Sequence, residues 1–121
     1  MSHGGQERRR YPRVDFPCRL VLGSPLRAIS SHTENISEGG LRVILEEKLL
    51  TFTEVGVEFF VEKRKTIKCK GRIVWVVEKI NPLDKEAIMF DTGIEFTGIK
   101  DADKGYIRNL IVTLLSKKQE Y

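Results

Sequence analysis

The chain has 121 residues, of which 40% are hydrophobic and 31% charged, and its formal net charge is +4. This length suits one domain with its own core, and the composition is that of a folded globular protein rather than a disordered one. No apolar run approaches the roughly 20 residues of a membrane-spanning helix, and Met1–Glu7 has no apolar stretch typical of a signal peptide. We therefore expect a cytoplasmic protein without membrane insertion.

A basic arm begins the chain. Residues 1–13 hold four arginines against one glutamate, and we expect them to form a flexible arm because they have little apolar content to anchor them. Arg9 and Arg13 form an R-x-x-x-R pattern, with Arg8 and Arg10 beside them. Guanidinium groups bind phosphate oxygens and the O6/N7 edge of guanine, and they stack on purine faces. The arm therefore predicts a localised anionic partner, with a solvated basic tail as the alternative.

Alternating apolar and polar residues predict strands in the first half of the chain. Val14–Leu22 has a period of two, which indicates a half-buried strand, and Gly23–Pro25 marks a turn. A more polar strand is expected from Ala28 to about Ser37. Another begins after a pair of glycines and covers Leu41–Leu45.

The residues that join these two strands form an N-x-S-x-x-G pattern. Asn35 and Ser37 are two positions apart, so on a strand their side chains share one face. Gly39 and Gly40 permit a close backbone approach at the strand end. The pattern predicts a short polar patch beside an open strand end, and a glycine-containing turn without a ligand is the alternative.

The second half of the chain predicts more strands. Val55–Val61, Ile67–Val77 and Phe90–Phe96 alternate or are strongly apolar, with a basic hairpin tip at residues 63–65 and a turn at Asn81–Asp84. Five or six short strands favour a small closed or nearly closed β-barrel, which leaves no exposed strand edge. We interpret the basic hairpin as a solvated face and Trp75 as a core residue.

The hydrophobic period changes once, near the C-terminus. The apolar residues there recur at helical spacing and are Ile107, Leu110, Ile111, Leu114 and Leu115. Asp101 suits the N-cap position and Lys117 and Lys118 suit the negative end of a helix. We therefore divide the chain into the arm, 1–13, and one domain, 14–121, which ends in a helix over about 101–118.

Catalytic and metal-binding patterns are missing from the sequence. Cys18 and Cys69 lack C-x-x-C spacing, and His3 and His32 are isolated, so no zinc ligand set can be assembled. Both cysteines fall in alternating segments, where buried thiols are expected. Because no nucleophile–base pair, paired carboxylates or phosphate-binding loop can be defended either, the sequence predicts neither an enzyme nor a cofactor.

In this order and spacing, the two polar patterns resemble the PilZ family of cyclic di-GMP receptors. The similarity continues through Gly71–Trp75, through Thr92–Phe96 and through the C-terminal helix, so it covers nearly the whole domain. It implies an all-β barrel of about six antiparallel strands followed by one α-helix. Asn35 stands where the family more commonly has Asp, which leaves that guanine-facing position neutral.

The resemblance also implies a ligand and its contacts. Arg9 and Arg13 would contact phosphates and guanine, Asn35 and Ser37 would hydrogen-bond a guanine, and Gly40 would keep the strand end open. Accessory positions are Arg8, Arg10, Gly39 and Gly93.

The predicted function is that of a cyclic di-GMP receptor or adaptor. Ligand capture would change the conformation of the arginine-rich arm and so regulate a downstream protein, with motility, biofilm formation or virulence as the type of output. Two alternatives stay open. One is a small basic β-barrel that binds nucleic acid, which is not the expected partner because aromatic residues are only 8% of the chain. The other is a PilZ-like protein-interaction module without nucleotide binding.

Overall fold

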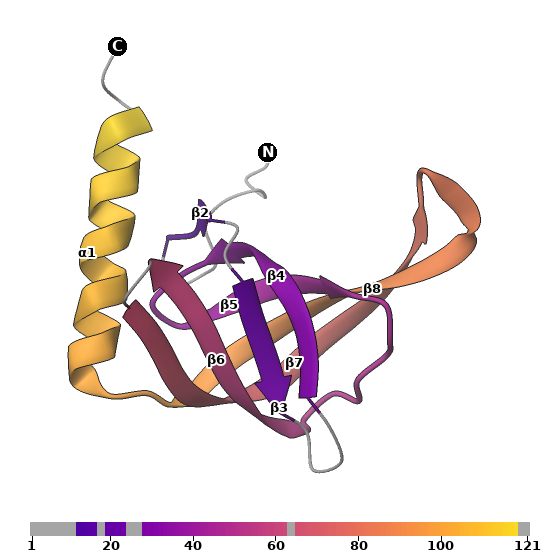
Figure 1. The fold of residues 1–121 in the computed structure, drawn as a ribbon, viewed down its shortest axis with the longest axis horizontal. Coiled ribbons are helices and arrows are strands. Elements are labelled where there is room, and N and C mark those ends of the chain that lie inside the picture. Colours follow the sequence, from indigo (N-terminus) through magenta and orange to yellow (C-terminus); the bar gives the residue numbers. More distant parts are fainter. Residues whose placement is uncertain (1–11, 17–18, 24–27, 63–64, 119–121) are drawn as a thin grey trace, which may run out of the picture.

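The structure is a computed structural model that describes residues 12–16, 19–23, 28–62 and 65–118. Figure 1 shows a small β-barrel with one helix along its side. In chain order the elements are β2 (Val14–Asp15), β3 (Arg19–Gly23), β4 (Ala28–Ile36), β5 (Gly40–Leu45), β6 (Glu54–Glu62), β7 (Lys65–Asn81), β8 (Asp84–Gly98) and α1 (Asp101–Lys118). Among these described segments, no helix is long and apolar enough to cross a membrane.

Pairing between β4 and β5 closes the barrel. The order is β2-β4-β3-β6-β7-β8-β5, and β5 pairs in addition with β4. Six antiparallel strands, β3 to β8, therefore form a closed ring, and β2 is a short extra strand on β4. This confirms the predicted fold class of about six antiparallel strands with one C-terminal helix.

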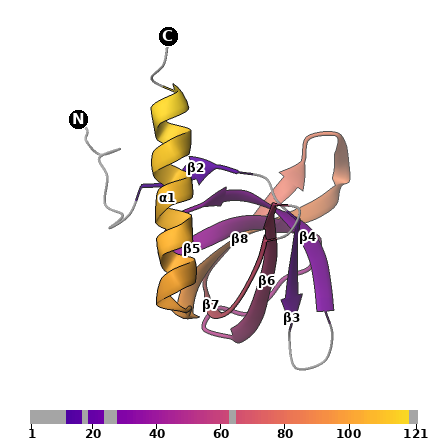
Figure 2. The same cartoon turned by 60° about the vertical axis from the view of Figure 1, so that its left-hand side comes forward.

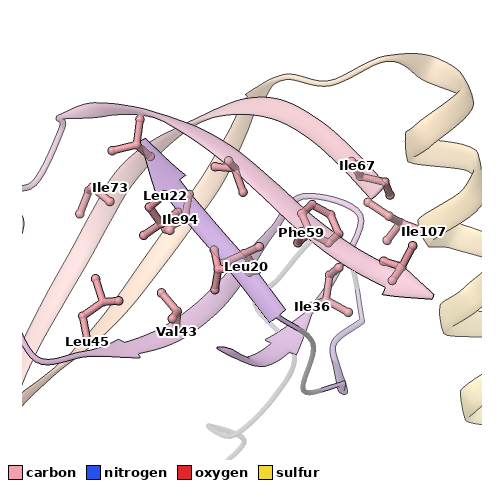
Figure 3. Close-up of a cluster of buried hydrophobic side chains, with 14 of the residues drawn as sticks. Leu20, Leu22, Ile36, Val43, Leu45, Phe59, Ile67, Ile73, Ile94 and Ile107 are labelled. Atoms are coloured by element: carbon pink, nitrogen blue, oxygen red, sulfur yellow. The ribbon is translucent and has the colours of Figure 1, made fainter. Parts of the chain in front are cut away.

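The barrel interior is filled by the inward-pointing residues of the alternating strands, as predicted from their period of two. Figure 3 shows side chains from several strands and the helix converging there. The ring of Phe59 stacks on that of Phe96 with centroids 5.9 Å apart. The fully buried large side chains are Phe59, Leu20, Leu22, Ile36, Leu45, Ile67, Ile73 and Ile107.

Helix α1 packs its apolar stripe against the barrel. Ile107 and Ile111 are buried, and Leu114 and Leu115 pack against the core more loosely. Figure 2 shows the helix running along the side of the barrel near β2. Its first turn carries acidic residues that suit the positive end of a helix. One of them, Asp103, forms an ion pair with Lys65 at 3.2 Å.

The first predicted strand is interrupted, which corrects the expectation of one continuous strand over Val14–Leu22. Asp15 pairs with Asn35 and Arg19 pairs with His32, so four steps along this segment match three along β4. One extra residue is therefore accommodated between β2 and β3. Proline at position 17 has no N–H to donate to a continuous ladder.

Strands β7 and β8 are longer than the sequence predicted. Their pairing continues to Asn81 and Asp84, well past the last pair that β8 makes with β5. Figure 1 shows this two-stranded ribbon projecting from the barrel on the side away from α1. It carries apolar side chains that are exposed to solvent: Ile80, Leu83 and Ile88.

Of the two cysteines, only Cys69 lies within the described residues. It is half-buried against the core, and burial raises the pKa of its thiol to about 12. The prediction of a buried structural thiol therefore fits Cys69, while Cys18 lies outside the described part of the chain.

Candidate functional site

The N-x-S-x-x-G segment forms a tight turn between β4 and β5. The Ser37 amide donates to the carbonyl oxygen of Gly40 at 2.8 Å, and the Gly39 amide donates to Ser37 Oγ at 3.1 Å. The carbonyl oxygen of Gly39 accepts from the Phe96 amide at 2.8 Å, which ties the turn to β8. Ser37 is therefore used to shape the turn, and the turn presents backbone to its surroundings.

Glycine is required at position 40 because the neighbouring strand approaches too closely for a side chain. A Cβ atom there would lie 2.0 Å from the carbonyl oxygen of Ile94. Real Cβ atoms do not come this close to a backbone atom, so even alanine would force β5 and β8 apart. That Gly40 keeps the strand end open for a ligand stays a prediction.

Trp75 lies outside the barrel core, which corrects its assignment as a core residue. The pairing of β7 with β8 shifts between Ile73 and Trp75, so that Trp75 pairs with Gly93 instead of Thr92. Such a bulge inserts one residue and moves the following side chains to the opposite face. Ile73 is fully buried, whereas Trp75 is half-buried on the outer face. A Cβ atom on Gly93 would lie 2.2 Å from the Trp75 ring, so the indole rests on this glycine.

Four strands contribute to one cross-strand row on the outer face. The register pairs Asn35 with Arg42, Arg42 with Gly93, and Gly93 with Trp75. Arg42 is held in this row by Asp91, which accepts hydrogen bonds from its Nε at 2.7 Å and its Nη2 at 2.8 Å. The row therefore places an amide, a guanidinium and an indole in a line across the barrel wall.

The Asp91 carboxylate is a buried anchor for this row. It also accepts an ion pair from Lys79 at 2.7 Å, and its side chain is only 5% exposed. The hydrogen bonds from Arg42 keep the pKa of Asp91 below its usual range, and the same contact raises the pKa of Arg42. Both groups are thus charged at neutral pH, and the Arg42 side chain stays in place.

A cavity of about 250 Å³ opens beside the row. Its lining comes from the residues before β2, from the turn, and from β5, β7 and β8. The lining residues are Arg13, Ser37, Gly39, Gly40, Leu41, Val74, Trp75, Gly93, Ile94 and Glu95. Glycines and exposed backbone make one wall, the indole makes another, and a guanidinium and a carboxylate stand at the cavity. Such a site can accept a planar, hydrogen-bonding ligand with both polar and stacking faces.

Several of the residues predicted for the site meet at this cavity. Arg13, Ser37, Gly39, Gly40 and Gly93 all line it, although they come from parts of the chain far apart in sequence. Their roles toward a ligand stay predictions.

The other predicted residues do not line the cavity in the structure. Asn35 lies in the neighbouring row, and its Oδ1 is buried with no hydrogen-bond partner among the described residues. Arg8, Arg9 and Arg10 lie outside the described part of the chain. Asn35 is therefore a buried acceptor next to the cavity, and a donor from a ligand would satisfy it.

Sequence reasoning missed Trp75 and Glu95, which bring an aromatic and a charged side chain to the cavity, as well as three aliphatic lining residues. Trp75 looks like core from its apolar neighbours, and only the bulge at Val74 reveals its outward position. Glu95 lies within the Thr92–Phe96 segment that carries the resemblance, and its alternation with the buried Ile94 already places its side chain on the outer face. Its side chain is exposed at the cavity and makes no hydrogen bond or ion pair within the described segments.

The basic hairpin is partly neutralised in the structure. Lys65 pairs with Asp103 and lies over the ring of Tyr106, and Lys68 is 3.7 Å from Glu58. Tyr106 donates a hydrogen bond to Glu62, which raises the pKa of the phenol to about 12. These contacts hold the helix against the hairpin. They favour the interpretation of the hairpin as a solvated face rather than as a surface that binds nucleic acid. The described residues also contain no cluster of histidine, cysteine or acidic residues that could hold a metal ion.

Comparisons with known proteins agree on one family. The sequence model of the PilZ domain matches residues 7–113. No curated protein matches the chain in sequence.

Solved structures share the fold at low sequence identity. The PilZ domain of YcgR from Escherichia coli, solved with c-di-GMP, is 15% identical with a TM-score of 0.74, over 94% of this chain and 96% of that one. MotI/DgrA, an inhibitor of motility from Bacillus subtilis, is 18% identical with a TM-score of 0.80, over 94% of this chain. MrkH of K. pneumonia in complex with c-di-GMP is 17% identical with a TM-score of 0.73, over 93% of this chain. This chain spans only 54% of MotI/DgrA and 55% of MrkH.

Proposed function

We propose that this chain, which belongs to the PilZ domain family, is a receptor for cyclic di-GMP that passes the signal to a downstream protein without catalysing a reaction. The observation that carries the proposal is the cavity itself. It brings Arg13, the Ser37–Gly40 turn and Gly93 together, and Trp75 forms a wall beside them. Similar domains of YcgR and MrkH have been solved with c-di-GMP.

The chemistry of the ligand matches the groups at the site. Cyclic di-GMP carries two phosphates and two guanines, so it needs cations, hydrogen-bonding groups and flat surfaces. Arg13 supplies a fork of donors for a phosphate or for the guanine O6/N7 edge, and Trp75 offers a stacking face. The buried Oδ1 of Asn35 is an acceptor that a guanine N1–H or N2–H would satisfy.

The basic arm completes the proposal. Arg13 lies at the cavity and Arg9 is four residues earlier, so ligand capture would draw the arm toward the barrel wall. Ordering the arm against β2 and the turn would create a new surface that a partner protein can recognise. We place motility, biofilm or virulence control downstream of that surface.

Calorimetry tests the proposal directly. The full chain is titrated with cyclic di-GMP, with cyclic di-AMP as a base control. We expect saturable binding of the guanine ligand alone, and Arg9→Ala and Arg13→Ala should each weaken it strongly. The matched control is Lys85→Ala, which removes one positive charge from the exposed β7–β8 ribbon and should leave affinity unchanged. Absence of heat from the parent protein at high micromolar ligand would refute the receptor function.

A further inference from the structure

The C-terminal helix makes an ion pair with the turn that borders the cavity. Arg108 of α1 donates from Nε at 3.0 Å and from Nη2 at 2.8 Å to the same carboxylate oxygen of Glu38. Glu38 lies between Ser37 and Gly39, both of which line the cavity. The two residues are 70 positions apart, so the contact is made only by the folded domain.

The Glu38 carboxylate is poorly exposed to water. Its side chain is 13% exposed, while that of Arg108 is 57% exposed. The turn backbone is fixed on both sides, by the Ser37–Gly40 hydrogen bond and by the bond from Phe96 to Gly39. The backbone of Glu38 is therefore held at the edge of the cavity, and its carboxylate is paired with Arg108.

A carboxylate in this position conflicts with an anionic ligand. Charges several ångströms apart in a partly dry site interact more strongly than in bulk water, and a ligand with two phosphates would be repelled. Glu95 already places one carboxylate at the cavity. A second carboxylate without compensation would oppose the attraction that Arg13 offers.

We propose that Arg108 is a positioning residue that neutralises Glu38 and so makes the Ser37–Gly40 turn acceptable to an anionic ligand. This inference rests on the proposed cyclic di-GMP function. It gives α1 a part in ligand binding although no residue of the helix lines the cavity, and it links the helix electrostatically to the turn.

A double-mutant cycle separates neutralisation from simple anchoring of the turn. We measure cyclic di-GMP affinity by calorimetry at low salt for the parent, Glu38→Gln, Arg108→Gln and the double variant. Arg108→Gln should weaken binding about fivefold because it exposes the charge of Glu38, and added salt should reduce the loss. Glu38→Gln and the double variant should both stay within about threefold of the parent, because no carboxylate remains to repel the ligand.

Two further variants serve as controls. Arg108→Lys keeps a positive charge and should retain most of the affinity, whereas Lys117→Gln removes a charge from an exposed position on the same helix and should have no effect. Thermal unfolding of each variant verifies that the domain is folded.

The possible results are distinct. If Glu38→Gln and the double variant bind as weakly as Arg108→Gln, the pair only anchors the turn and the inference is wrong. Equal affinity in all variants also overturns it while leaving the receptor function intact. If the parent itself does not bind cyclic di-GMP, the proposed function fails and this inference fails with it.

Discussion

The same two strands, β5 and β8, form both faces of the barrel wall, but the residues on the inner and outer faces differ in kind. On the inner side, Val43, Leu45 and Thr92 are buried in close packing. On the outer side, Gly93 alternates with polar neighbours and leaves a hollow that an indole partly covers. The inner side sets the position of the backbone, and the outer side uses that position to present a ligand site. The comparison shows that substitutions at neighbouring positions of one strand can alter either the stability of the domain or its ligand binding.

The largest effect on the free energy of unfolding is expected in the N-x-S-x-x-G segment, where inner and outer residues alternate. Ile36→Ala removes a fully buried side chain between Asn35 and Ser37, and should lower the free energy of unfolding by about 2–5 kcal/mol. Asn35→Ala removes an acceptor that has no partner in the described structure, so it should cost less than about 1 kcal/mol. Urea unfolding measures both. Similar losses for the two variants would contradict the division between the sides.

Removal of the indole should affect binding more than stability. Trp75→Ala takes away a stacking wall and should weaken cyclic di-GMP binding by about 1–3 kcal/mol. Because Trp75 is half-buried outside the core, the unfolding midpoint should change much less than in Ile36→Ala. Trp75→Phe should recover part of the affinity. If Trp75→Ala instead unfolds the domain while sparing its affinity, the ring belongs to the inner side.

A smaller effect is expected from filling the hollow under the ring. In Gly93→Ala the new methyl group would displace the indole, since its Cβ lies 2.2 Å from the ring. We expect about a fivefold loss of affinity and a shift in tryptophan fluorescence, which reports Trp75 alone because the chain has one tryptophan. Gly56→Ala, where the nearest atom is 3.9 Å away, is the matched control. An unchanged spectrum in Gly93→Ala would refute the contact.

The smallest effect is expected on the stability of the domain at low pH. The pKa of Asp91 is lowered by its hydrogen bonds from Arg42, so the ionised form is favoured in the folded protein. Its stabilising contribution is complete above the pKa that Asp91 has in the unfolded chain, and it is lost as pH falls through the lower folded-state pKa. Asp91→Asn should therefore flatten the acid limb of the stability curve. An acid limb identical to that of the parent would show that other carboxylates govern it.

The barrel and helix were predictable because each depends on a regular period. Alternation in β6 and in the first half of β7 matches the buried side chains, and the helical stripe places Ile107 and Ile111 against the core. A period is a local property, so the sequence displays it directly. The length of the β7–β8 ribbon was missed because pairing beyond the barrel needs no buried face, and its exposed apolar residues look like those of a core strand.

The site was predictable in composition but only partly in arrangement. Gly40 and Gly93 are required by close approaches between strands, and a motif can mark such positions. The position of Trp75 depends on a register shift between two strands, which is a relation between distant segments and leaves no pattern of its own. The outward position of Asn35 has the same origin, because the pairing of β4 with β5 also shifts between Thr33 and Asn35.

The extra residue at Val74 has a consequence beyond the ring of Trp75. In a strand, odd-numbered and even-numbered residues point to opposite sides of the sheet. An extra residue at a bulge exchanges these two sets for the rest of the strand, up to the next bulge. Another shift in pairing comes only between Ile80 and Asn81. Every side chain from Trp75 to Ile80 therefore lies on the side opposite to the one that uninterrupted alternation from Ile73 would give it. A deletion of Val74 would remove the bulge but leave Trp75 opposite Gly93 and Val76 opposite Thr92, so the stretch would keep its present sides.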